Sequence, residues 1–128
     1  MSDIGTQVHT KFKVFVGELA SDRSIGEIGG KVAAFAKSEG AAAKSIGVEY
    51  LESLKALVVT LGYRTDEKPY PIRLHSVPLG KLPALASDFS ALENAMGNAA
   101  EEYANVICHE LYVTETQDFF LVLMTHES

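Results

Sequence analysis

The chain has 128 residues, of which 47% are hydrophobic and 22% charged, and its 17 acidic and 11 basic residues give a formal net charge of −6. This length and balance are typical of one globular domain, so we expect residues 1–128 to form a single domain. The negative charge, with no basic stripe, argues against a nucleic-acid binder. No apolar run approaches the ~18 residues that a membrane span needs, and we expect neither membrane association nor a secretory signal.

The cysteine content indicates the cellular compartment. Cys108 is the one cysteine of the chain, so no intrachain disulfide can form. Free thiols persist in reducing compartments, and we therefore expect a cytoplasmic protein.

The first half of the chain predicts a strand, a helix and a hairpin. Residues 8–16 alternate between apolar and polar side chains, which is typical of a half-buried strand. Ser24 and Glu27 have the spacing of a capping box, and the apolar stripe behind them predicts a helix that ends between residues 40 and 44. Residues 45–53 and 56–64 then predict a hairpin that turns at residues 52–55.

Three glycines interrupt this predicted helix. Gly26, Gly29 and Gly30 each cost about 1 kcal/mol relative to alanine in a helix interior. Close packing of the helix on a sheet would explain them, and a frayed first turn or a later start of the helix are the alternatives.

The second half repeats the same order. Residues 65–71 contain two prolines and predict a connection. Tyr70, Ile72 and Leu74 alternate with Arg73 and His75, which predicts a strand, followed by a loop at residues 77–83.

A second helix and hairpin complete the repeat. The helix is expected to start at Ser87 or Asp88, with an apolar stripe made of Leu85, Phe89, Leu92, Met96, Ala99 or Ala100, and Tyr103. Residues 106–114 and 117–126 then predict a hairpin that turns at residues 114–117.

Together the halves predict an α+β fold. The pseudo-repeats 8–64 and 70–127 correspond to a duplicated βαββ unit of the ferredoxin-like kind, with one antiparallel sheet and two helices packed on one face. Strands 56–64 and 119–124 are nevertheless apolar on both faces, although an uncovered face normally shows polar alternation. Because an exposed apolar face usually marks an interface, we expect a homo-oligomer whose open sheet face is covered by another subunit or encloses a ligand.

Three segments resemble the dodecin family. They are a lysine-rich strand ending in Gly-Glu (KFKVFVGE, from residue 11), a serine-led helix start (SIGE, from residue 24) and an aliphatic strand ending in Gly-aromatic-Arg (VVTLGYR, from residue 58). The resemblance covers residues 11–64 and implies a βαββ unit, oligomerisation and flavin binding. The chain departs from the family in having no tryptophan, the residue that stacks on flavin there, and Tyr50 is the candidate replacement.

Polar residues on the open face form the candidate site. If Phe12, Val14, Ile72 and Leu74 point to the helices, their neighbours point the other way. Such a mixture of charged donors, acids and a phenol would orient an anionic or carbonyl-bearing ligand in an apolar cavity. A solvated strand face with cross-strand charge pairs is the alternative. The predicted ligand-binding residues are Lys13, Glu49, Arg73, His75, Glu110 and Tyr112.

Histidine and glutamate offer acid–base chemistry. A histidine with a pKa near neutrality can act as a general base that a glutamate orients. His109 and Glu110 are adjacent in a strand and face opposite ways, so the expected pair is His75 with Glu110 or with Glu49.

No ligand spacing such as HxxxH or CxxC joins His75, His109, His126 and Cys108, and we predict no metal site. Cys108 itself is predicted to be a buried, inert thiol.

Two functions from different classes fit these features. The first is an oligomeric module that binds a small aromatic or anionic ligand. The alternative is a cofactor-independent isomerase or monooxygenase of the dimeric α+β-barrel type, with His75 and Glu110 as candidate catalytic residues. A scaffold without a pocket is the third option.

Overall fold

The computed structural model describes residues 9–18, 23–81 and 89–127. It confirms an α+β fold. The elements in chain order are β1 (Lys11–Glu18), α1 (Arg23–Glu39), β2 (Ala42–Leu51), the 3-10 turn η2 (Glu52–Leu54), β3 (Ala56–Arg64), β4 (Ile72–Lys81), α3 (Phe89–Ala100), β5 (Val106–Val113) and β6 (Asp118–His126). Neither described helix is both long and apolar enough to cross a membrane.

The strands form two antiparallel sheets where one was predicted. Sheet A has the order β1-β3-β2, and sheet B has the equivalent order β4-β6-β5. The two sheets approach each other along β2 and β5. Each half thus follows the predicted order of strand, helix and hairpin.

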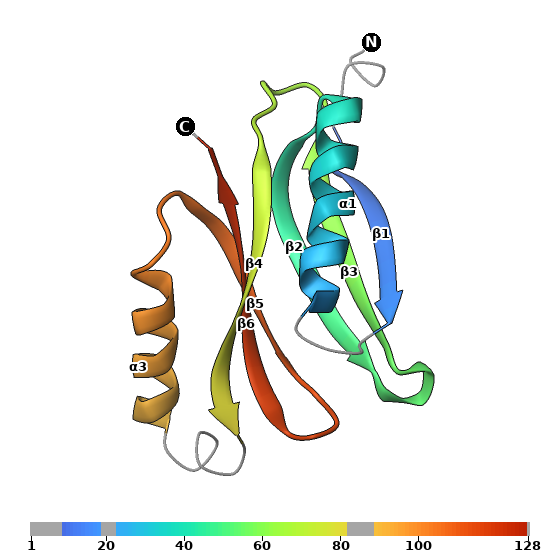
Figure 1. Ribbon diagram of the computed structural model, residues 1–128. Coiled ribbons are helices and arrows are strands. Elements are labelled where there is room, and N and C mark those ends of the chain that lie inside the picture. The colour runs from blue at the N-terminus through green and yellow to red at the C-terminus, as the bar shows by residue number, and fades with distance from the viewer. Residues whose placement is uncertain (1–8, 19–22, 82–88, 128) are drawn as a thin grey trace.

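The helices lie on opposite faces of sheet B, so the prediction of two helices on one face is wrong. Helix α1 contacts β1, β3 and β4, whereas α3 contacts β4 and β6 from the other side (Figure 1). Strand β6 is apolar on both faces because Val122 and Met124 join the core around α1, while Leu121 and Leu123 pack with Ala99 of α3. No second subunit is needed to cover β6.

Helix α1 is wedged between the two sheets. One continuous core joins the inner faces of both sheets to the buried stripe of the helix. The members of this core include Ile25, Ile28 and Val32 of α1, Leu57, Val59 and Leu61 of β3, and Ile72, Val122 and Met124 of sheet B. Full burial of one such valine, leucine, isoleucine or methionine side chain contributes about 1.5–3 kcal/mol to folding.

A glycine ends α1 and lets β2 begin at once. Gly40 adopts a φ of +59°, the Ala41 amide donates to the Ala36 carbonyl (2.9 Å), and the Gly40 amide donates to the Lys37 carbonyl (3.4 Å). This is a Schellman motif, which satisfies the last helical carbonyls. The strand therefore begins at Ala42, three residues earlier than predicted.

Both hairpin turns lie where they were predicted. Residues 52–55 form η2 and a left-handed Lys55 with a φ of 48°. In the second turn Gln117 has a φ of 65°, and its amide donates to the Thr114 carbonyl (2.9 Å).

Strand β4 is longer than predicted. It continues to Lys81, with a register shift between Pro78 and Gly80, where a loop was expected. Because β4 is an edge strand, the missing amide of Pro78 is tolerated, and a bulge absorbs the extra residue. The predicted helix starts, Ser87 and Asp88, and the stripe residue Leu85 lie outside the described residues.

Strand β1 presents the opposite face to the one predicted. Phe15 pairs with Val59 and is buried, whereas Phe12, Val14 and Val16 are 67%, 56% and 57% exposed. The prediction followed the longer apolar row and missed Phe15. Lys13 therefore lies on the inner face, with its Nζ 5.7 Å from the centre of the Phe35 ring.

Two neighbouring glycines of α1 differ in their surroundings. A Cβ built at Gly29 would lie 3.2 Å from Leu74 Cβ, whereas one at Gly30 would meet nothing within 4 Å. Close packing thus explains Gly29 and not Gly30. We expect Gly30→Ala to raise the free energy of unfolding by about 1 kcal/mol through helix propensity, and Gly29→Ala to gain clearly less. Urea denaturation of both variants tests this, and equal gains would contradict the close contact at Gly29.

Candidate functional site

The six predicted ligand residues do not converge. Arg73 and His75 lie on the face of sheet B that carries α3, because they pair with Thr125 and Leu123. Glu110 pairs with Val122 and so lies on the inner face. His75 and Glu110 are therefore on opposite faces of one sheet and do not form the expected acid–base pair.

The remaining predicted residues are also dispersed. Glu49 pairs with Val58 on the outer face of sheet A, the face turned away from α1, and so it does not pair with His75 either. Tyr112 is only 5% exposed and its ring stacks on Phe120, with centroids 5.2 Å apart and planes at 12°. It belongs to the core and is not presented to a ligand.

His75 is held by sheet B and by the chain that follows α3. Its Nε2 is 2.9 Å from Thr125 Oγ1, and its ring centroid is 4.3 Å from that of Tyr103. Burial, and then the charge of Arg73, lower the pKa of His75 below its usual 6.5. The imidazole is therefore neutral at pH 7 and can offer one donor and one acceptor.

A groove runs between α1 and β4, and residues 72–75 of β4 line it, although Arg73 and His75 belong to the strand face that carries α3. Two adjoining hollows of about 390 and 520 Å³ share Ala33 and Ile72, a size suited to a small ligand. Small residues of α1 form one wall, and residues 69–75 form the other. The charged groups along the groove are Lys37, Arg73 and Glu127.

The absence of side chains on α1 creates this groove. Gly29 lets the helix approach Leu74, while Gly26 and Gly30 leave open space beside β4. The glycines were visible in the sequence as costly helix residues, but their position beside Arg73 depends on the packing of α1 against the second half of the chain.

The ion pair in the groove is weak. Arg73 Nε lies 2.9 Å from Glu127 Oε1, and both side chains are more than half exposed. Exposed pairs of this kind contribute about 0–1 kcal/mol. An incoming anion can therefore replace Glu127 at small cost.

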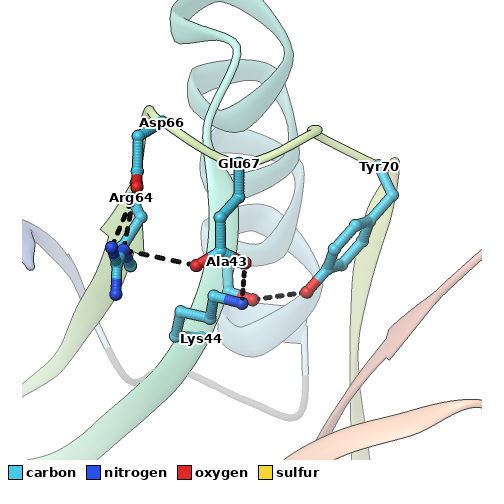
Figure 2. Close-up of polar contacts among 6 residues, drawn as sticks. All are labelled: Ala43, Lys44, Arg64, Asp66, Glu67 and Tyr70. Atoms are coloured by element: carbon cyan, nitrogen blue, oxygen red, sulfur yellow. Dashed lines mark hydrogen bonds and ion pairs between the residues drawn. The ribbon is translucent and has the colours of Figure 1, made fainter. Parts of the chain in front are cut away.

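A cluster of polar contacts fixes the far wall of the groove (Figure 2). The Tyr70 hydroxyl donates to the Ala43 carbonyl at 2.6 Å. Arg64 pairs with Asp66 (2.9 Å) and Glu67 (3.2 Å), and Lys44 also pairs with Glu67. The hydrogen bond from Arg64 is the main reason that the pKa of Asp66 lies below its usual value.

The outer face of sheet A is a second candidate surface. Besides Phe12, Val14 and Val16 it carries Val58, Thr60 and Gly62, with Glu49 at the β2 side. The Phe12 ring covers Gly62, since a Cβ built there would be 3.5 Å from Phe12 Cε1. This face is apolar and, within the described residues, no helix covers it.

The residues do not fit a stacked flavin on this face. Tyr50, the candidate replacement for tryptophan, pairs with Leu57 and packs against the main core. No metal-binding group of three histidine, cysteine or acidic side chains occurs among the described residues. Burial raises the pKa of the half-buried Cys108 thiol, which keeps it protonated.

Comparison of the chain with protein-family models, curated proteins and solved structures finds no match. The dodecin-like character of residues 11–64 therefore stays a prediction.

Removing the Tyr70 hydroxyl tests the wall of the groove. We expect Tyr70→Phe to lower the free energy of unfolding by about 1 kcal/mol, because it leaves the Ala43 carbonyl without this donor. Tyr63→Phe is the matched control, since its ring packs on Phe35 and its hydroxyl bonds to no described residue. Equal losses in the two variants, measured by urea denaturation, would contradict a role for this hydrogen bond.

Proposed function

We propose that this protein is a self-associating module that binds a small ligand with an anionic group and an apolar body. The observation that carries the proposal is the exposure of three large apolar side chains, Phe12, Val14 and Val16, in one row of an edge strand. A row of large apolar side chains exposed on a sheet face usually marks a surface that another chain covers.

A second copy of the chain is the proposed partner for this face. In sheet B the corresponding row, Ile72 and Leu74, is covered by α1 of the same chain. The chain therefore shows within itself how a helix of one half covers such a row of the other half. Among the side chains that the structure describes, Glu49 is the charged one that strand pairing places beside the exposed row, and the centre of the face, at Val14, Val58 and Thr60, carries no charge to desolvate.

The groove between α1 and β4 is the proposed ligand site. Lys37 and Arg73 supply positive charge along the groove, and alanines and prolines supply apolar walls. Arginine recognises carboxylate and phosphate groups by paired hydrogen bonds. The geometry thus favours a small carboxylate or phosphate ester with an aromatic or aliphatic body.

The two halves are proposed to be repeats of one βαββ unit, as in ferredoxin-like and dodecin-like proteins. The support is their common strand order and their pairing. Glu49 lies opposite Val58 as Glu110 lies opposite Val122, and each second strand has a register shift near its start.

The enzyme alternative is less well supported. Its candidate catalytic pair is divided between two faces of sheet B, and Tyr112 is buried. We therefore favour binding over turnover.

Ligand binding is testable by a thermal-shift screen with benzoate, phenyl phosphate and flavin mononucleotide. At a hundredfold excess over its dissociation constant a ligand stabilises by about 2.7 kcal/mol. We expect Arg73→Gln to weaken binding of an active anion by about tenfold or more, because it removes a charged hydrogen bond. Lys81→Gln is the matched control, since Lys81 forms a similar exposed pair with Asp118 at the other end of β4. An equal effect of both substitutions would place the anion elsewhere.

Self-association is testable by light scattering at micromolar concentration. We expect an oligomer for the wild-type protein and a monomer for Val14→Lys, which puts a charge into the exposed apolar row. Because Val14 is 56% exposed, the fold itself should change in stability by no more than about 0.5 kcal/mol. Leu54→Lys is the control, because Leu54 is 72% exposed but lies on η2. A monomeric wild-type protein would end the proposal.

A further inference from the structure

We infer that the self-association is head-to-tail, with the outer face of sheet A of one copy docking on α3 and the adjoining face of sheet B of the next copy. This inference rests on the proposed self-association and names the surface that receives the exposed row. It depends on treating the contact between the two halves of one chain as a template for the contact between chains.

The register of the sheets defines which residues correspond. Val14 pairs with Thr60 in sheet A, and Leu74 pairs with Met124 in sheet B. Counting from the common pair Val58 and Val122, which face Glu49 and Glu110, Val14 corresponds to Leu74 and Phe12 to Ile72. The exposed row of β1 is therefore the counterpart of the row of β4 that α1 covers.

The two helices also correspond in their placement. Phe35 of α1 contacts Phe15 edge-on, with centroids 5.9 Å apart, and Tyr103, just after α3, contacts His75 at 4.3 Å. Phe15 and His75 occupy equivalent positions in β1 and β4. These aromatic contacts align Gly29 of α1 with Gly97 of α3, since each glycine precedes its aromatic residue by six positions.

The two glycines differ in one respect. Gly29 receives Leu74 within the chain, with Leu74 Cβ 3.2 Å from the position of a Cβ, whereas a Cβ at Gly97 would meet nothing within 4 Å. Gly97 is thus a vacant counterpart of the Gly29 contact. Val14 is the exposed counterpart of Leu74, and Val14 of a second copy is the residue that we expect to fill the open position at Gly97.

Sheet B also offers the rest of the receiving surface. Helix α3 covers β4 and β6, and Leu111 and Val113 on the same face of β5 remain partly exposed. In the first half, the corresponding part of β2 is covered by β5 of the other sheet. The surface beside α3 therefore lacks the layer that its counterpart in the first half has.

The proposed head-to-tail contact differs from a symmetric dimer in the surfaces that it joins. A head-to-tail contact joins two different surfaces, whereas a two-fold dimer joins two copies of the same surface. Substitutions on the two surfaces therefore behave differently when they are mixed.

The experiment combines Val14→Lys, which blocks the row, with Gly97→Leu, which fills the vacant position. Gly97→Leu has open space around it and improves helix propensity, so the monomer should fold. Asn94→Arg, one turn away on α3, provides a second block, and Gly30→Leu on α1 is the matched control that should still associate. Circular dichroism verifies the fold of each variant.

We expect each blocking variant alone to weaken self-association by about thirtyfold or more. An equimolar mixture of Val14→Lys and Gly97→Leu should restore a 1:1 complex, because each partner retains the surface that the other has lost. If Gly97→Leu associates as the wild type does and the mixture forms no complex, the contact is symmetric and this inference is wrong while the proposed self-association stands. If the wild-type protein is a monomer, both fail together.

Discussion

The packing of α1 between the two sheets is the contact on which the rest of the structure depends. One side of the helix buries Ile28 and Val32 against sheet A, and Gly29 brings another side close to Leu74 of sheet B. A helix that packs against two sheets needs apolar side chains on the side that faces the first sheet and small residues on the side that faces the second. That requirement explains Gly29, which is unfavourable for the helix alone but allows the second half of the chain to approach.

Much of the fold could be predicted from the sequence, because periodicity and turn residues act locally. The hairpin turns at residues 52–55 and 114–117 and the order of strands and helices followed from these signals. The division into two sheets did not, since an apolar strand such as β6 has the same pattern whether a partner or its own chain covers the second face. The face of β1 was mistaken because Phe15 stands alone in its row, yet this single ring reaches the core and sets the orientation.

The candidate site was predicted only in part, for a related reason. Arg73 and His75 are two positions apart on one strand, so their common face followed from alternation alone. Glu49, Glu110 and Tyr112 were added by assuming a single sheet, and the second sheet separated them. The groove that does receive Arg73 has α1 as its other wall, and a contact between elements some forty residues apart leaves no local mark on the sequence beyond the glycines themselves.

The anchored connection between β3 and β4 bears on how such a molecule avoids exchanging its halves. Two similar halves joined by a connecting segment can exchange between copies by domain swapping. Whether they exchange depends on whether the segment extends toward another copy or is held against its own chain. Here Glu67 pairs with Lys44 of β2 and the Tyr70 hydroxyl donates to the Ala43 carbonyl of β2, while Arg64 of β3 pairs with Glu67. The second half is thereby kept at a high effective concentration near its own first half. Intramolecular closure is favoured over exchange, and each copy matures as a self-contained unit before it meets another.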